Sequence, residues 1–116
     1  YVHADPVLME QVILNLARNG IESMEENPAD DRQVTIRSRT YQDEAVEIQV
    51  VDRGRGIDPQ QEANLFTPFF STKPQGTGLG LHICRSIVEA HGGHVWVTRN
   101  DPQGVTFHFS LPSVYA

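Results

Sequence analysis

The chain is poor in the residue types that mark several large protein classes. Its only cysteine, Cys84, excludes an internal disulfide and a zinc site built on several cysteines. Acidic residues outnumber basic ones by 15 to 9, and the net charge of −6 argues against general binding to nucleic acid or to an anionic membrane. No apolar run reaches the length of a membrane span, and no charged-then-apolar leader begins the chain. We therefore expect a soluble, cytoplasmic fragment without direct membrane contact.

Histidine-based metal sites also have little support, because the five histidines form neither H-x-x-x-H nor H-E-x-x-H. The 116 residues, 39% of them hydrophobic, suffice for one domain with one core, so we expect a single domain over residues 1–116. The chain opens with YVHAD, as if in the middle of a strand, which predicts a piece of a longer protein.

The most informative stretch is TPFFSTKPQGTGLGL, residues 67–81. Its glycines Gly76, Gly78 and Gly80 let the backbone approach a ligand closely, and an apolar helix predicted over 79–91 would aim its free N–H groups at that ligand. This pattern indicates a phosphate cradle, although an ordinary turn is the alternative. In an acidic domain, the positive potential would come from helix N–H groups, Lys73 and a divalent cation.

A helix is predicted over 7–24, with Asp5 as its cap and Pro6 in its first position. One side of this helix is apolar. The other carries a polar stripe with two asparagines, Asn15 and Asn19, four residues apart. Asparagine is a mediocre helix former, so these amides indicate partners such as a metal ion or its water ligands. A solvated polar face is the alternative.

Two alternating stretches, 34–41 and 45–51, predict a hairpin whose first strand is half-buried. The second strand leads into DRGRGI, which begins at Asp52. A carboxylate at a strand end, before a Gly-x-Gly turn, is well placed to accept a hydrogen bond from an exocyclic amine such as the adenine N6. The alternative is an aspartate that only closes an Asx-turn.

The rest of the chain predicts a short helix over 60–65, strands over 94–98 and 105–111, and a turn at 100–104. Helices and strands do not alternate strictly. We therefore expect an α/β two-layer sandwich, with a mixed but largely antiparallel sheet and the helices on one face.

Taken together, these stretches resemble the ATP-binding catalytic domain of sensor histidine kinases, in the superfamily of gyrase, Hsp90, histidine kinase and mismatch-repair ATPases. EQVILNLARNGIESM (10–24) resembles the N box, DRGRGI (52–57) the G1 box, residues 65–70 the F box and GTGLGL (76–81) the G2 box. GVTFHFSLP (104–112) is similar to the closing strand of the family. The short segment between F box and G2 box resembles the nitrogen-regulatory and oxygen-sensing subtype. The resemblance implies a Bergerat-type fold that binds ATP with Mg²⁺.

The resemblance also implies roles for individual residues. Asn19 would hold Mg²⁺, and Asn15, Asn19 and Lys73 would be the catalytic residues. Asp52 would read the adenine amine, and Thr106 would support the adenine end. The full set of implied nucleotide contacts is Asn15, Arg18, Asn19, Asp52, Gly54, Gly56, Ile57, Phe70, Thr72, Lys73, Gly76, Thr77, Gly78, Leu79, Gly80, Leu81 and Thr106.

Asn15 stands where the true ATPases of this superfamily carry a glutamate that activates water, and an amide cannot take that proton. The resemblance therefore implies phosphoryl transfer to a histidine on the dimerisation helices of the parent protein, and then to a response-regulator receiver domain. No histidine of this chain is followed by an acidic residue, so the fragment should bind ATP without phosphorylating itself. A water-hydrolysing ATPase, an anti-sigma-type serine kinase and an adaptor that binds no nucleotide are the alternatives. The chain departs from the family at Gly20, where alanine is usual.

Overall fold

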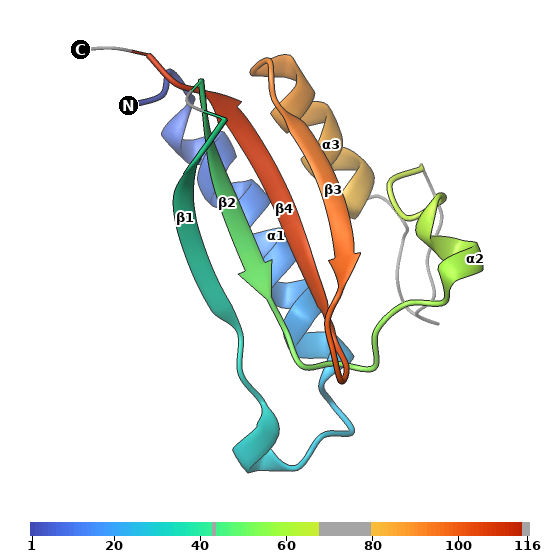
Figure 1. Ribbon diagram of the computed structural model, residues 1–116. Helices are drawn as coiled ribbons and strands as arrows, with labels where there is room; N and C mark the ends of the chain where they lie inside the picture. Colours follow the sequence, from blue (N-terminus) through green and yellow to red (C-terminus); the bar gives the residue numbers. More distant parts are fainter. Residues whose placement is uncertain (43, 68–79, 115–116) are drawn as a thin grey trace.

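The computed structural model describes residues 1–42, 44–67 and 80–114, which form a sheet with two long helices on one of its faces (Figure 1). The two-layer α/β fold predicted from the sequence is confirmed. The elements in chain order are α1 (Pro6–Ser23), the 3-10 helix η1 (Ala29–Asp31), β1 (Thr35–Tyr41), β2 (Ala45–Val51), α2 (Pro59–Glu62), α3 (Gly80–Ala90), β3 (His94–Arg99) and β4 (Val105–Pro112). No helix within these described ranges is long and apolar enough to cross a membrane.

The sheet has the strand order β1-β2-β4-β3, and each of these neighbouring pairs is antiparallel. The registers place Val50 opposite both Ile36 and Phe107, and Val97 opposite Phe107. Because side chains alternate between the two faces of a strand, these residues share the face that α1 and α3 cover. The predicted largely antiparallel sheet and its first hairpin are thus confirmed.

The core lies between this face and the two long helices. On α1, the buried residues Val12, Leu16 and Gly20 recur every four positions, the spacing of one helix face. The cap predicted for α1 is present, because the Asp5 carboxylate accepts hydrogen bonds from the N–H groups of Val7 and Leu8. The buried core consists of Val12, Leu16, Val50, Leu65, Cys84, Val88, Val105, Phe107, Phe109 and Leu111.

Three local predictions were wrong. The strand β1 is not half-buried: it is the edge of the sheet, and Ile36 stays 52% exposed because α1 packs on β2 rather than on β1. The short helix ends at Glu62, and the chain continues in turns, in which the N–H groups of Asn64, Leu65 and Thr67 donate to carbonyls three residues earlier. The loop at residues 27–31 contains η1. The remaining elements lie within about one or two residues of their predicted ends, the usual uncertainty of helix and strand boundaries.

Candidate functional site

The candidate site forms around Asp52, the first residue after β2, whose side chain is only 2% exposed. Its Oδ1 accepts hydrogen bonds from the N–H groups of Gly54, at 2.9 Å, and Val105, at 3.1 Å. The bond to Gly54 closes an Asx-turn, so the structural alternative for Asp52 is present as well. This bond and the one from Val105 both engage Oδ1. Oδ2 is therefore the oxygen that could accept a hydrogen bond from a ligand.

Burial raises the pKa of the Asp52 carboxyl, and the two backbone hydrogen bonds partly oppose this rise. In both bonds a backbone N–H donates to the carboxylate, so the bonds favour the ionised form of Asp52. The site thus holds a desolvated carboxylate with one oxygen fixed by the backbone. A ligand amine would form a stronger hydrogen bond with this oxygen than with a water molecule, because the local dielectric constant is low.

The wall beside Asp52 is the helix α1, which approaches closely at Gly20. A Cβ atom at this position would lie 3.2 Å from the Asp52 Cβ and 3.4 Å from Oδ2. One turn later, the loop after β2 packs against the end of α1: a Cβ at Gly54 would overlap the Ser23 Oγ and would lie 2.9 Å from the Ser23 carbonyl oxygen. Glycine at 54 is therefore a packing requirement, and it fixes the loop to α1. The departure from the family at residue 20 likewise fits the close contact with Asp52.

Asn15 and Asn19 lie one turn apart on the partly buried stripe of α1, as predicted. The Cys84 thiol, on α3, donates to the Val12 carbonyl of α1 at 3.8 Å. Burial raises the pKa of this thiol to about 11, and the nearby Asn15 amide opposes the rise. The predicted role of Cys84 as a small buried thiol is thus confirmed. Arg18, on α1, is exposed.

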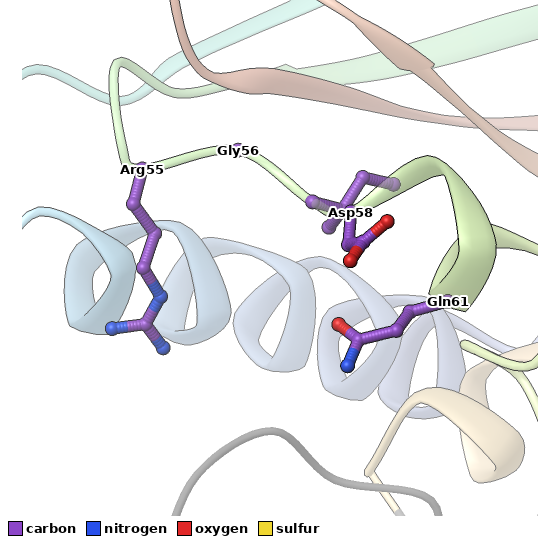
Figure 2. A pocket seen from close by; sticks show the side chains of 5 residues that line it. Arg55, Gly56, Asp58 and Gln61 are labelled. Carbon is purple, nitrogen blue, oxygen red and sulfur yellow. The ribbon is translucent and has the colours of Figure 1, made fainter.

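A pocket of about 480 Å³ opens along the loop that follows Asp52. It is lined by Arg55, Gly56, Ile57, Asp58 and Gln61. Figure 2 shows the side chains of Arg55, Asp58 and Gln61 projecting to the same side of the loop and of α2. Two of the lining residues, Gly56 and Ile57, were predicted, and Gly56 has a positive φ of 78° that favours glycine.

Three pocket residues were missed by the sequence reasoning. Arg55 is the residue between the two glycines of the G-x-G turn. Its place within the G1 box, close to Asp52, could have predicted it as a pocket residue. Asp58 carries an N-cap signal, because its carboxylate accepts a hydrogen bond from the N–H of Gln60 at 2.9 Å. Gln61, three residues later on α2, follows from that cap. The cap brings the Asp58 and Gln61 side chains to the pocket.

Thr106, which was predicted to support the adenine end, lies on β4. It pairs with Val51 and Thr98, so its side chain points to the sheet face away from α1 and α3. Its hydroxyl donates to the Asn100 Oδ1 at 2.8 Å, and the Asn100 Nδ2 donates to the Asp52 carbonyl at 3.2 Å. Thr106 therefore supports Asp52 from behind, through Asn100. The position directly beside Asp52 belongs to Val105.

The start of α3 supplies the last described part of the predicted cradle. Gly80 is its exposed first residue, and Leu81 is partly buried against the core. The predicted contacts at positions 70–79 lie outside the described residues: Phe70, Thr72, Lys73, Gly76, Thr77, Gly78 and Leu79.

No group of three or more histidine, cysteine, aspartate or glutamate side chains within the described ranges could hold a metal ion. Amide oxygens and the oxygens of a bound ligand are other groups that can coordinate a Mg²⁺ ion. The described geometry offers two amides on α1, a buried acceptor at Asp52 and a pocket lined by the loop after Asp52 and by α2. That combination is suited to a ligand with an amine-bearing ring and an anionic tail.

Comparison with known proteins identifies the class. The model of the family of histidine kinase-, DNA gyrase B- and HSP90-like ATPases matches residues 4–114, and the chain belongs to this family. It is 42% identical over 112 residues to the sensor protein FixL of Bradyrhizobium diazoefficiens, covering 97% of this chain and 22% of FixL. It is 47% identical over 111 residues to the C4-dicarboxylate transport sensor protein DctS of Rhodobacter capsulatus, covering 96% of this chain and 17% of DctS. The chain thus spans about a fifth of the length of these relatives.

Solved structures agree with the fold. A nucleotide-free catalytic domain of the histidine kinase ThkA has a TM-score of 0.80 and 42% sequence identity, over 96% of this chain and 70% of that one. Full-length ShkA in complex with AMPPNP has a TM-score of 0.82 and 29% identity, over 99% of this chain and 24% of ShkA.

Proposed function

We propose that this chain is the cytoplasmic ATP-binding catalytic domain of a longer sensor histidine kinase. It binds Mg·ATP and presents the γ-phosphate to a histidine on a separate dimerisation domain of the parent protein. A receiver-domain aspartate of a response regulator then takes the phosphoryl group. The observation that carries this proposal is the Asp52 side chain, in which two backbone N–H groups hold Oδ1, so that Oδ2 would be the acceptor for a ligand.

Adenine fits this open oxygen. The exocyclic N6 amine is a donor and Oδ2 of an ionised carboxylate can only accept, whereas guanine presents a carbonyl at the equivalent position. Gly56 and Ile57 line the pocket beside Asp52 and supply its backbone and apolar surface. The AMPPNP in the ShkA complex supports a nucleotide as the ligand of this fold.

Mg²⁺ fits the donor set of α1. This ion keeps most of its waters and takes few protein ligands, and the substrate phosphates supply the rest. An amide oxygen from Asn19, with Asn15 one turn away, meets that modest demand, and no carboxylate cluster is required. The ion would neutralise charge on the transferring phosphate. Lys73 remains a prediction for the same role.

The residue at Asn15 favours phosphoryl transfer over hydrolysis. A side-chain amide has no proton-accepting group near neutral pH, so a water molecule beside it would not be activated. A neutral imidazole nitrogen needs no such help. Its lone pair attacks the γ-phosphorus in line, the bond to the β–γ bridging oxygen breaks, and ADP leaves with the electron pair. The positioning of Mg·ATP is then the whole contribution of this domain.

Calorimetric titration of the chain with AMPPNP, with and without Mg²⁺, tests the proposal, and a GTP analogue serves as the control. Saturable, adenine-selective and Mg²⁺-enhanced binding is the expected result. If a thermal melt shows that the sample is folded and it still binds none of these ligands, the chain would be an adaptor that binds no nucleotide. Turnover of ATP by the isolated chain would instead favour the water-hydrolysing alternative.

A further inference from the structure

The outer face of the sheet, opposite α1 and α3, carries a buried ionised residue. The side chain of Glu47, in the middle of β2, is 0% exposed although no helix of the described structure covers that face (Figure 1). Glu47 pairs with Arg39 on β1 and Ser110 on β4, and the alternation of β2 separates it from the core residue Val50. Neighbouring side chains on the strands therefore shield Glu47 from solvent.

Polar groups on three sides satisfy this carboxylate. The Arg39 guanidinium donates to it twice, at 3.2 and 3.3 Å, the Gln49 amide donates once, and the His108 Nδ1 lies 3.2 Å away. Burial alone would raise the pKa of Glu47, but the hydrogen bonds from Gln49, Arg39 and His108 hold it below its ordinary value. Glu47 is thus ionised and its charge is neutralised within the face.

Aromatic rings form the outer layer of the same face. Trp96 stacks on His108 with a ring separation of 5.0 Å and an angle of 5°, and the Tyr41 ring lies 5.8 Å from Trp96. The remaining ring nitrogen of His108 lies 2.7 Å from the Thr98 hydroxyl. The rings are therefore held in place by a saturated hydrogen-bond network beneath them.

The charge of this face is opposite to that of the domain. Its outward positions on the four strands include Arg37 and Arg39, and their only carboxylate is the buried Glu47. The Arg39 side chain is still 60% exposed although it binds Glu47. By contrast, the whole chain has a net charge of −6. We call the set Arg37, Arg39, Tyr41 and Trp96 the arginine–aromatic face.

We propose that the arginine–aromatic face is a docking surface for an acidic segment of a partner protein. Arginine, tryptophan and tyrosine are the residue types that dominate binding energy at protein interfaces. A guanidinium pairs with a carboxylate through two parallel hydrogen bonds, and the fixed rings offer apolar surface without further loss of side-chain entropy. The partner therefore carries carboxylates for Arg37 and for the free edge of Arg39, next to an apolar side chain for Trp96.

A protein segment fits this surface better than a nucleic acid does. Two arginines cannot offset the −6 charge of the domain over the length of a phosphate backbone. A short acidic peptide would contact only the arginine–aromatic face, where the potential is locally positive. At physiological salt, the negative charges elsewhere on the domain would repel it little, because charges beyond about 8 Å are largely screened.

The only tryptophan of the chain, Trp96, is a built-in reporter for the test. The probe is a tryptophan-free synthetic peptide in which glutamates flank one leucine; the matched probe has glutamine at each glutamate. Saturable change in Trp96 emission with the glutamate peptide alone is the expected result. Heparin and anionic vesicles of phosphatidylserine are run in parallel, and binding to them as tight as to the peptide would overturn the proposal.

Arg37→Glu is the decisive variant, because Arg37 takes no part in the network around Glu47. Reversing this charge should weaken peptide binding about tenfold, the effect of one well-placed interfacial charge. Arg85→Glu, on α3, makes the same change in net charge on the other side of the sheet and should have little effect. Equal losses in both variants, or no loss in Arg37→Glu, would refute the surface. Amide chemical-shift mapping must place the peptide on β1 and β3, whereas shifts confined to the helices would count against it.

Discussion

Replacing Asp52 by asparagine should abolish adenine recognition without unfolding the domain. Oδ1 accepts from two backbone N–H groups, at Gly54 and Val105, so the asparagine oxygen must take its place. The amide cannot flip, because its NH₂ would then face two donors. Its Nδ2 therefore replaces Oδ2 and meets the adenine N6 donor to donor. One charge-assisted hydrogen bond contributes about 1.5–3 kcal/mol, so affinity for AMPPNP should fall roughly tenfold to a hundredfold.

The same variant should be at least as stable as the wild type. Burial raises the pKa of the Asp52 carboxyl, so the folded state binds this proton more tightly than the unfolded state does. That contribution to stability is present in acid and is lost as the pH rises through the raised pKa. At neutral pH, the ionised side chain thus costs stability, and asparagine removes this cost. The melting temperature of Asp52→Asn should equal or exceed that of the wild type, and the difference should shrink as the pH is lowered.

Calorimetry with AMPPNP and a GTP analogue, together with melts from acid to neutral pH, provides the assay. Asp58→Asn is the matched control: it changes the same charge in a pocket-lining residue, and asparagine still caps α2. The control should leave adenine affinity nearly unchanged. In the wild type, adenine binding should weaken as the pH falls through the raised pKa, and this dependence should vanish in Asp52→Asn. Wild-type affinity in Asp52→Asn would refute the assignment, whereas a large drop in its melting temperature would mean that the carboxylate is structural.

Three further predictions concern residues around the pocket. Gly54→Ala should lower the melting temperature by several degrees, because an added Cβ would lie 2.9 Å from the backbone of α1. Gly80→Ala should not lower it, because no atom of the described residues lies within 4 Å of a Cβ there. Equal melting temperatures would contradict the tight packing of the loop on α1. Asn19→Ala should remove the Mg²⁺ enhancement of AMPPNP binding and spare the Mg²⁺-free affinity, and calorimetry showing unchanged enhancement would place the metal elsewhere. Cys84, fully buried with a pKa of about 11, should react with thiol reagents at pH 8 only as fast as the domain opens, and rapid labelling of the native protein would disprove its burial.

The helix α1 and the strand β2 could be predicted because the residues that define each of them are close together in the sequence. An aspartate–proline start and apolar residues every four positions define α1 without reference to any other element. The exposure of β1 could not be read in the same way. Whether a strand is an edge depends on the strand order β1-β2-β4-β3, which pairs segments that lie far apart in the sequence.

The direction of the Thr106 side chain had a signal in the sequence. Phe107, Phe109 and Leu111 alternate along β4, and their apolar character puts odd-numbered positions on the core side. Thr106 must then face outward, as found. The burial of Glu47 had no such signal, because it depends on Arg39 and His108, which reach it from two other strands, and on Trp96, which stacks on His108 from a third.

The contact between Gly54 and Ser23 has a consequence for how the nucleotide is discriminated. The Arg55 N–H donates to the Ser23 carbonyl at 3.3 Å, and the Ser23 hydroxyl donates to the Gly20 carbonyl at 2.7 Å, so the loop, the end of α1 and the wall beside Asp52 form one rigid unit. The conformational entropy of this unit is lost when the domain folds, before any nucleotide arrives. Selection of the base at Asp52 would therefore require no ordering of this loop when a nucleotide binds.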